Sequence, residues 1–171
     1  MRRSVLAKKP GQRGVPDYRL SLHLNYLVAR RGLPSTLTFR KWMIATLHTV
    51  GYAHHNIELS LRLVNQAEAK RLNRRYRGRD YATNVLSFPV DLPVPVDPIL
   101  LGDLVICAPV VAREAKEQGK LLRHHYAHLT IHGLMHLLGY DHQTARAAEQ
   151  MEAMEKQILA LFAISNPYEA L

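Results

Sequence analysis

Cysteine is almost absent from this sequence, which contains only Cys107. One cysteine excludes an intramolecular disulfide and a zinc cluster built on cysteines, so any metal must be held mainly by His, Asp or Glu. Long apolar runs are also missing: no stretch approaches the length of a membrane span, and residues 5–7 are too short for the core of a signal peptide. We therefore expect a cytoplasmic protein with no membrane partner.

Acidic residues are scarce in the first fifty positions, which contain ten Lys and Arg but only one acid, Asp17. The chain has a formal net charge of +9, and the rest of the sequence is balanced. Within that remainder lies a second basic cluster, whose members are Lys70, Arg71, Arg74, Arg75, Arg77 and Arg79. This cluster favours a polyanionic partner, of which RNA and DNA are the commonest, although a solvated surface would show the same composition.

The 171 residues, 47% hydrophobic and 22% charged, fit a single globular domain. Residues 1–16 carry charge, Gly and Pro without periodicity and are predicted to be a basic, disordered tail, which leaves 17–171 for the domain. Alternating or apolar segments predict strands at 20–26, 57–63, 85–90 and 101–107. Amphipathic segments predict helices at about 36–50, 65–76, 109–119, 122–138 and 144–162.

Helix ends are marked by capping residues. Thr36 or Thr38 is predicted to begin the first helix and Gly51 to end it, and Asn65 to begin the second. Strands interleaved with helices, without an internal repeat or linker, predict one α+β (mixed α/β) domain. We expect a small mixed sheet of about four strands, packed with about five helices and carrying a metal site at the end of a long helix.

Histidines gather near the end of the longest predicted helix, with six of the ten between residues 124 and 142. His132 and His136 share one helix face, separated by about 6 Å of rise. Gly139 can stop the helix and reverse the chain, and His142 follows three residues later. Three protein ligands with a fourth position open are typical of catalytic zinc, which lowers the pKa of bound water to about 7. His124 drifts off this face and His128 lies at its margin, and both are interpreted as structural or substrate-facing rather than as ligands.

The spacing of the three histidines is also that of the metzincin proteases, in which a glutamate directly after the first histidine is the general base. Gly133 stands at that position here. The ligand pattern is therefore present, while the residue needed for peptide hydrolysis is absent.

Three ordered motifs resemble those of the YbeY family of bacterial endoribonucleases and rRNA maturation factors. Residues 128–142 read HLTIHGLMHLLGYDH and resemble its metal signature. A second motif covers 72–80 (LNRRYRGRD) and 83–89 (TNVLSFP), and a third covers 101–107 (LGDLVIC). The resemblance extends over nearly all of 17–171.

The resemblance implies one α+β domain with a zinc-like ion on His132, His136 and His142. It further implies hydrolysis of single-stranded RNA, a role in maturing the 3′ end of small-subunit (16S) rRNA, and a role in ribosome quality control, with no small-molecule cofactor. Arg77 matches the arginine that the family places near the metal. Asn84 stands where many members carry Asp; it keeps the hydrogen-bonding shape without the charge, and we assign it no catalytic role.

Arg77 is therefore the predicted catalytic residue, because a guanidinium can bind two phosphoryl oxygens as negative charge develops. Asp141 is predicted to orient a histidine rather than to act as the base. Two alternatives remain: a ribosome-binding factor in which zinc only stabilises the fold, and a metalloprotease. The RNA-binding prediction covers the other members of the basic cluster, Lys70, Arg71, Arg74, Arg75 and Arg79.

Overall fold

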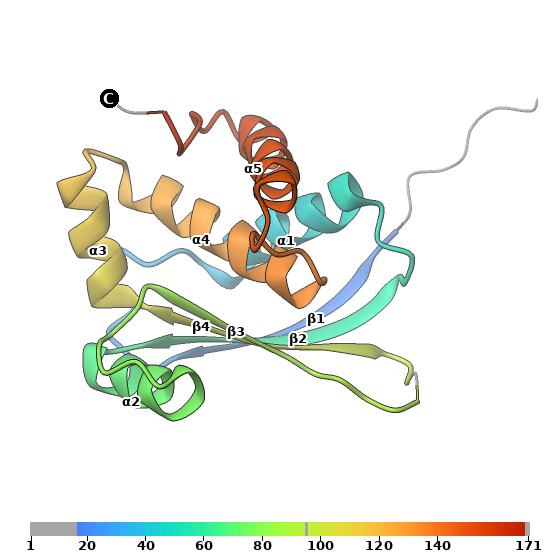
Figure 1. Cartoon of the computed structure of the whole chain (residues 1–171), viewed down its shortest axis with the longest axis horizontal. Helices are drawn as coiled ribbons and strands as arrows, with labels where there is room; N and C mark the ends of the chain where they lie inside the picture. The colour runs from blue at the N-terminus through green and yellow to red at the C-terminus, as the bar shows by residue number, and fades with distance from the viewer. Residues whose placement is uncertain (1–16, 95, 170–171) are drawn as a thin grey trace, which may run out of the picture.

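The computed structural model describes residues 17–94 and 96–169, and its sheet has four strands (Figure 1). The strands are β1 (Arg19–Tyr26), β2 (Asn56–Val64), β3 (Val85–Pro89) and β4 (Ile99–Cys107). They lie in the order β1-β2-β4-β3, with β3 antiparallel to β4 and the other neighbours parallel. The alternation that predicted these strands sets their faces: Leu59 and Leu61 are buried in the core, while Ser60 faces the other side.

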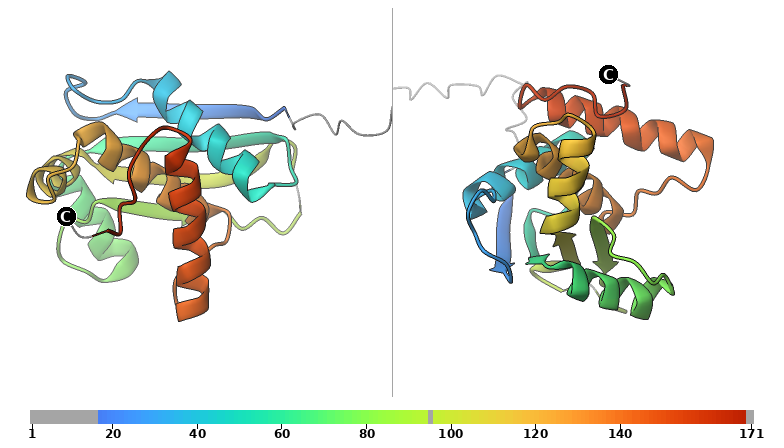
Figure 2. Two further views of the ribbon diagram at one scale, coloured as in Figure 1. Left: turned by 90° about the horizontal axis from the view of Figure 1, so that it is seen from above. Right: turned by 90° about the vertical axis from the view of Figure 1, so that its left-hand side faces the viewer.

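Helices cover the sheet unequally. The helices α1 (Thr36–Val50), α4 (Leu122–Leu137) and α5 (Ala145–Ala160) lie over one face, and α2 (Gln66–Arg77) lies against the opposite face (Figure 1). The helix α3 (Ala108–Glu117) stands at one end of the sheet. Figure 2 shows α5 outside α4, so that sheet, α4 and α5 form successive layers. The main core fills the space below α1, α4 and α5, and a smaller one lies under α2.

Local capping explains where the helices begin and end. The N-cap of α1 is Ser35, one residue before Thr36 and three before Thr38, because Ser35 Oγ accepts the Thr38 backbone N–H at 3.2 Å. The prediction that Thr36 or Thr38 caps this helix was wrong. Gly51 ends this helix with a φ of 63°, as predicted. Asn65 begins α2 by accepting the Glu68 N–H at 2.9 Å, also as predicted.

The predicted fold class, one α+β domain with four strands and five helices, is confirmed. The basic tail predicted for 1–16 lies outside the described residues. Among the described residues, no helix is both long and apolar enough to cross a membrane.

Candidate metal centre

The end of α4 and the turn after it bring the three predicted ligands together. His132 and His136 lie on one face of the helix, and their ring centroids are 4.6 Å apart. Gly139, at a φ of 93°, reverses the chain, and the Tyr140 N–H donates to the Met135 carbonyl at 3.0 Å. His142 returns to the same point, 5.1 Å from His136 and 5.7 Å from His132 between ring centroids. One ring nitrogen from each histidine lies within 4.8 Å of the others.

Hydrogen bonds fix which nitrogen each helical histidine presents. His136 Nδ1 donates to the Tyr140 carbonyl at 3.0 Å, and His132 Nδ1 donates to Glu155 Oε1 at 2.6 Å. Their Nε2 atoms therefore face one another, 3.0 Å apart, with lone pairs available for a metal. Burial, followed by the neighbouring His132 and His142, lowers the pKa of His136 and favours the neutral imidazole that coordinates metals. The donor set fits a zinc-like ion.

Glu155 is the main site residue that sequence reasoning missed. Its side chain is fully buried on α5, and besides His132 it lies 3.5 Å from His128 Nε2. Burial raises the pKa of Glu155, but contacts with His128 and His132 outweigh burial and lower it to about 2. A carboxylate behind a metal-binding imidazole fixes the ring and strengthens its basicity. A sequence signal existed: Glu155 is a lone charge at helical spacing from Met151 and Ile158, on the apolar side of its helix.

Tyr168, in the C-terminal segment, completes the support of Glu155. Its hydroxyl donates to Glu155 Oε2 and accepts from His128 Nε2 at 3.2 Å. Burial, together with the hydrogen bond to Glu155, raises the pKa of Tyr168, so the phenol keeps its proton. His128, Glu155 and His132 also form a second group with metal-binding spacing. Because Glu155 is enclosed and already hydrogen-bonded, we interpret this second group as the support of the first.

We expect Glu155→Gln to weaken zinc binding by roughly 10- to 100-fold, because losing a hydrogen-bonded partner behind a metal ligand has this cost. The substitution keeps the shape of the side chain and removes its charge. Titration of zinc against a competing chelator measures the change, and Glu149→Gln, an exposed position on the same helix, is the matched control. Equal zinc affinity in Glu155→Gln and the parent would show that the carboxylate only fills the core.

A cavity of about 520 Å³ opens in front of the three histidines. Arg77, Thr83 and Asn84 line its wall on the side of α2 and β3. The structure thus places the predicted catalytic arginine in the same cavity as the predicted metal ligands, although α2 and α4 lie on opposite faces of the sheet. They meet because β3 is an edge strand, which within residues 17–94 and 96–169 pairs only with β4, and the cavity lies at its free edge.

Asp141 also lines this cavity, and its carboxylate accepts the Gln143 backbone N–H at 3.2 Å. The Nδ1 partners of His132 and His136 are Glu155 and Tyr140, so an orienting role for Asp141 stays a prediction that concerns His142 alone. Asn84 donates to Glu114 at 3.0 Å and accepts the Val85 N–H at 2.7 Å. These contacts hold the start of β3 against α3. Asn84 also lines the cavity, and the absence of a catalytic role for it stays a prediction.

The remaining basic residues lie along the exposed side of α2 and just beyond it, outside the lining of the metal cavity. Some are paired with acids: Arg71 binds Glu68 at 2.7 and 2.8 Å, and Lys70 and Arg74 lie 3.7 and 3.9 Å from Asp80. Arg79 Nη1 donates to the Tyr81 hydroxyl at 3.2 Å. An RNA-binding role for Lys70, Arg71, Arg74, Arg75 and Arg79 therefore stays a prediction.

Gly133, at the position where a metzincin carries its glutamate, packs closely against the sheet. A Cβ atom there would lie 2.9 Å from Leu104 Cδ2 and 3.1 Å from Val85 Cγ2, closer than packed carbon atoms tolerate. The Gly133 carbonyl also accepts the Ser87 hydroxyl at 3.0 Å. A side chain at position 133, such as the glutamate of a metzincin, would therefore require the Leu104 and Val85 side chains to shift.

Comparison with known proteins places this site in a family. The sequence model of the family described as Endoribonuclease YbeY matches residues 34–163. Proteins named Endoribonuclease YbeY from Stenotrophomonas maltophilia (strain R551-3) and Xanthomonas euvesicatoria pv. vesicatoria (strain 85-10) are each 54% identical over 154 residues, covering 88% of this chain and 94% of theirs. The solution structure of TM1509 from Thermotoga maritima shares the fold, with a TM-score of 0.54 at 21% identity over 87% of this chain and 99% of that one. This chain therefore belongs to the YbeY endoribonuclease family.

Proposed function

We propose that this protein is a zinc-dependent endoribonuclease that cleaves single-stranded RNA in the cytoplasm. Its substrate is ribosomal RNA, with the 3′ end of 16S rRNA as the processed region and the small ribosomal subunit as partner, in maturation and in quality control. The observation that carries the proposal is the meeting of three metal-binding histidines and Arg77 in one open cavity. The names of the curated relatives give the reaction class.

The open cavity favours catalysis over a purely structural metal. A structural zinc site is normally closed by four protein ligands. Within the described residues, His132, His136 and His142 form one group of three, and the space beyond them is the cavity. A ribosome-binding factor in which zinc only stabilises the fold would not need that opening.

The metal ion, Arg77, Glu155 and Tyr168 each have a separate role in the proposed phosphodiester cleavage. A bound zinc ion supplies a Lewis acid and an activated water at neutral pH. Arg77 binds phosphoryl oxygens and stabilises the charge that develops on them. Glu155 holds the His132 ring so that Nε2 points into the cavity. Tyr168 in turn holds the Glu155 carboxylate.

The proposal is tested with purified protein on three labelled substrates: single-stranded RNA, duplex RNA and casein. We expect cleavage of the single strand alone, stopped by a chelator and restored by zinc. Casein cleavage would identify a metalloprotease. RNA binding without cleavage at any zinc concentration would identify a binding factor.

Single-strand binding is expected to depend on the exposed side of α2, and Arg74→Glu with Arg75→Glu should weaken it across sequences. Binding of single strands weakens with salt at a log–log slope of roughly −0.7 per phosphate contact, so the double variant should also flatten this slope. Affinity measured at several salt concentrations gives both values. Arg30→Glu with Arg31→Glu, an exposed pair following β1, makes the same charge change and is the control. Unchanged affinity and slope would leave the α2 residues as a solvated surface.

A further inference from the structure

An exposed aromatic ring lies at the end of α2. Tyr76 keeps 57% of its surface accessible, and its ring contacts Phe88 of β3 with the centroids 5.0 Å apart and the planes at 61°. Phe88 packs against the smaller core under α2, and this packing holds its ring in place. Tyr76 is thus held on one side by a fixed aromatic ring, while much of it faces solvent.

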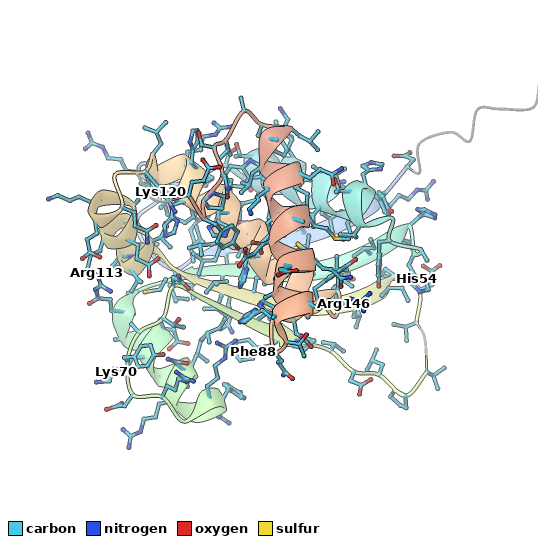
Figure 3. All side chains as sticks on the ribbon, turned by 45° about the horizontal axis from the view of Figure 1, so that its top comes forward. His54, Lys70, Phe88, Arg113, Lys120 and Arg146 are labelled. Carbon is cyan, nitrogen blue, oxygen red and sulfur yellow. The ribbon has the colours of Figure 1, made fainter. Side chains whose placement is uncertain are left out.

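The position of this pair relative to the metal cavity is set by the edge strand. Val85 and Ser87 of β3 line the cavity, whereas Leu86 and Phe88 belong to or pack on the smaller core on the other face. Phe88, labelled in Figure 3, belongs to the edge strand β3 and packs on its α2 side. Tyr76 directly precedes Arg77, which lines the cavity. The aromatic pair therefore lies across the edge strand β3 from the side chains that line the metal cavity.

We propose that Tyr76, supported by Phe88, is a stacking site for one unpaired RNA base that flanks the cleaved phosphate. This assignment rests on the proposed function and adds a substrate contact that the metal centre does not provide. Aromatic side chains bind single strands by stacking, with little sequence preference because every base has a π face. The Arg75 guanidinium lies over the Tyr76 ring, with its Cζ 5.4 Å from the centroid, and this cation–π contact brings a positive charge to the place where the base and its phosphate would bind.

Stacking on Tyr76 also gives a physical basis for single-strand selectivity. A base inside a duplex is already stacked on its neighbours and paired, so placing it on the ring would cost unstacking and unpairing energy. An unpaired base has no pairing to break and only the weaker stacking of a single strand to lose. The basic residues of α2, by contrast, attract the backbone of either form.

Tyr81 offers a matched comparison. It is 50% exposed in the segment after α2, and its hydroxyl contacts Arg79, much as Tyr76 neighbours Arg75. Among the described residues, however, Tyr81 has no aromatic neighbour. Tyr81→Leu therefore removes an exposed tyrosine from the same region without removing a supported stacking surface.

The experiment uses zinc-loaded protein and a short single-stranded RNA carrying one abasic nucleotide at each position in turn. The enzyme concentration that gives half the maximal single-turnover rate reports binding. For the parent, we expect it to rise at least about fivefold at one position beside the cleaved bond, since stacking of one base is worth that factor or more. With intact RNA, Tyr76→Leu should need the same higher enzyme concentration that the parent needs with the abasic RNA. The abasic RNA should raise this concentration no further for Tyr76→Leu. Tyr76→Phe and Tyr81→Leu should behave as the parent does.

Either of two results overturns the stacking site: Tyr76→Leu that keeps the full sensitivity to the abasic position, or Tyr81→Leu that weakens binding as much as Tyr76→Leu. A second measurement needs no variant. The fluorescence of 2-aminopurine at that position should be quenched when zinc-loaded parent binds, and an unquenched base in a bound RNA also refutes stacking. Failure of the proposed function is a different outcome, namely a parent that cleaves no RNA with zinc present.

Discussion

His142→Ala is expected to abolish RNA cleavage because it removes one of three ligands from the metal. Two histidines on one helix then remain, and two ligands from one side are too few to hold the ion. His142 is exposed in the turn after α4, outside both hydrophobic cores, so the metal-free fold should be unaffected. Zinc content should fall below one ion per chain, and cleavage should fall to the level seen with chelator.

Thermal unfolding separates loss of metal from loss of fold. A ligand present at 100 times its dissociation constant stabilises a protein by about 2.7 kcal/mol, which for a chain of this size raises Tm by roughly 5–10 °C. The parent should show this rise with zinc, and His142→Ala should not, while the two metal-free proteins unfold at the same temperature. His124→Ala, a half-buried histidine of α4 that lines a different pocket, is the control. Full zinc occupancy in His142→Ala would contradict the three-histidine centre.

Local sequence patterns were sufficient to predict much of the fold and the grouping of the three candidate metal ligands. The spacing of His132 and His136 with a glycine three residues later is a property of one helix and one turn, and needs no knowledge of the rest of the chain. The same holds for the strands, whose buried faces follow a period of two, and for helix ends such as Asn65 and Gly51. The start of α1 was wrong by one residue because Ser35, Thr36 and Thr38 are all capping types, and only backbone geometry decides among them.

The residues that hold the candidate metal ligands in place could not be predicted from local sequence patterns, because they come from distant segments of the chain. Glu155 reaches His132 only because α5 packs outside α4, and Tyr168 reaches Glu155 only because the chain turns back after α5. The place of Arg77 was likewise given by family resemblance rather than by spacing. The structure supplies the reason: α2 ends at the edge of the sheet, where β3 has no further neighbour to separate it from the α4 side.

Arg77→Ala is expected to slow the chemical step by about a hundredfold or more while leaving metal content and folding intact. The guanidinium is exposed at the end of α2 and lines the cavity opposite the histidines, so its removal leaves no gap in either core. An arginine aimed at developing phosphoryl charge acts mainly in the transition state, and its loss therefore lowers kcat. Loss of a contact that only positions a phosphate would instead raise KM and leave kcat nearly unchanged.

Single-turnover cleavage at saturating enzyme distinguishes the two roles of Arg77, because binding no longer limits the rate there. Arg77→Lys keeps the charge but not the paired donors, so it should restore only part of the rate. Arg79→Ala is the matched control: it lies two residues further along, is also exposed and contacts Tyr81 rather than the cavity. It should weaken binding at most and leave the saturated rate unchanged. If Arg77→Ala cleaves at the parental rate under saturation, the guanidinium binds RNA without taking part in catalysis, and the metal centre stabilises the transition state without it.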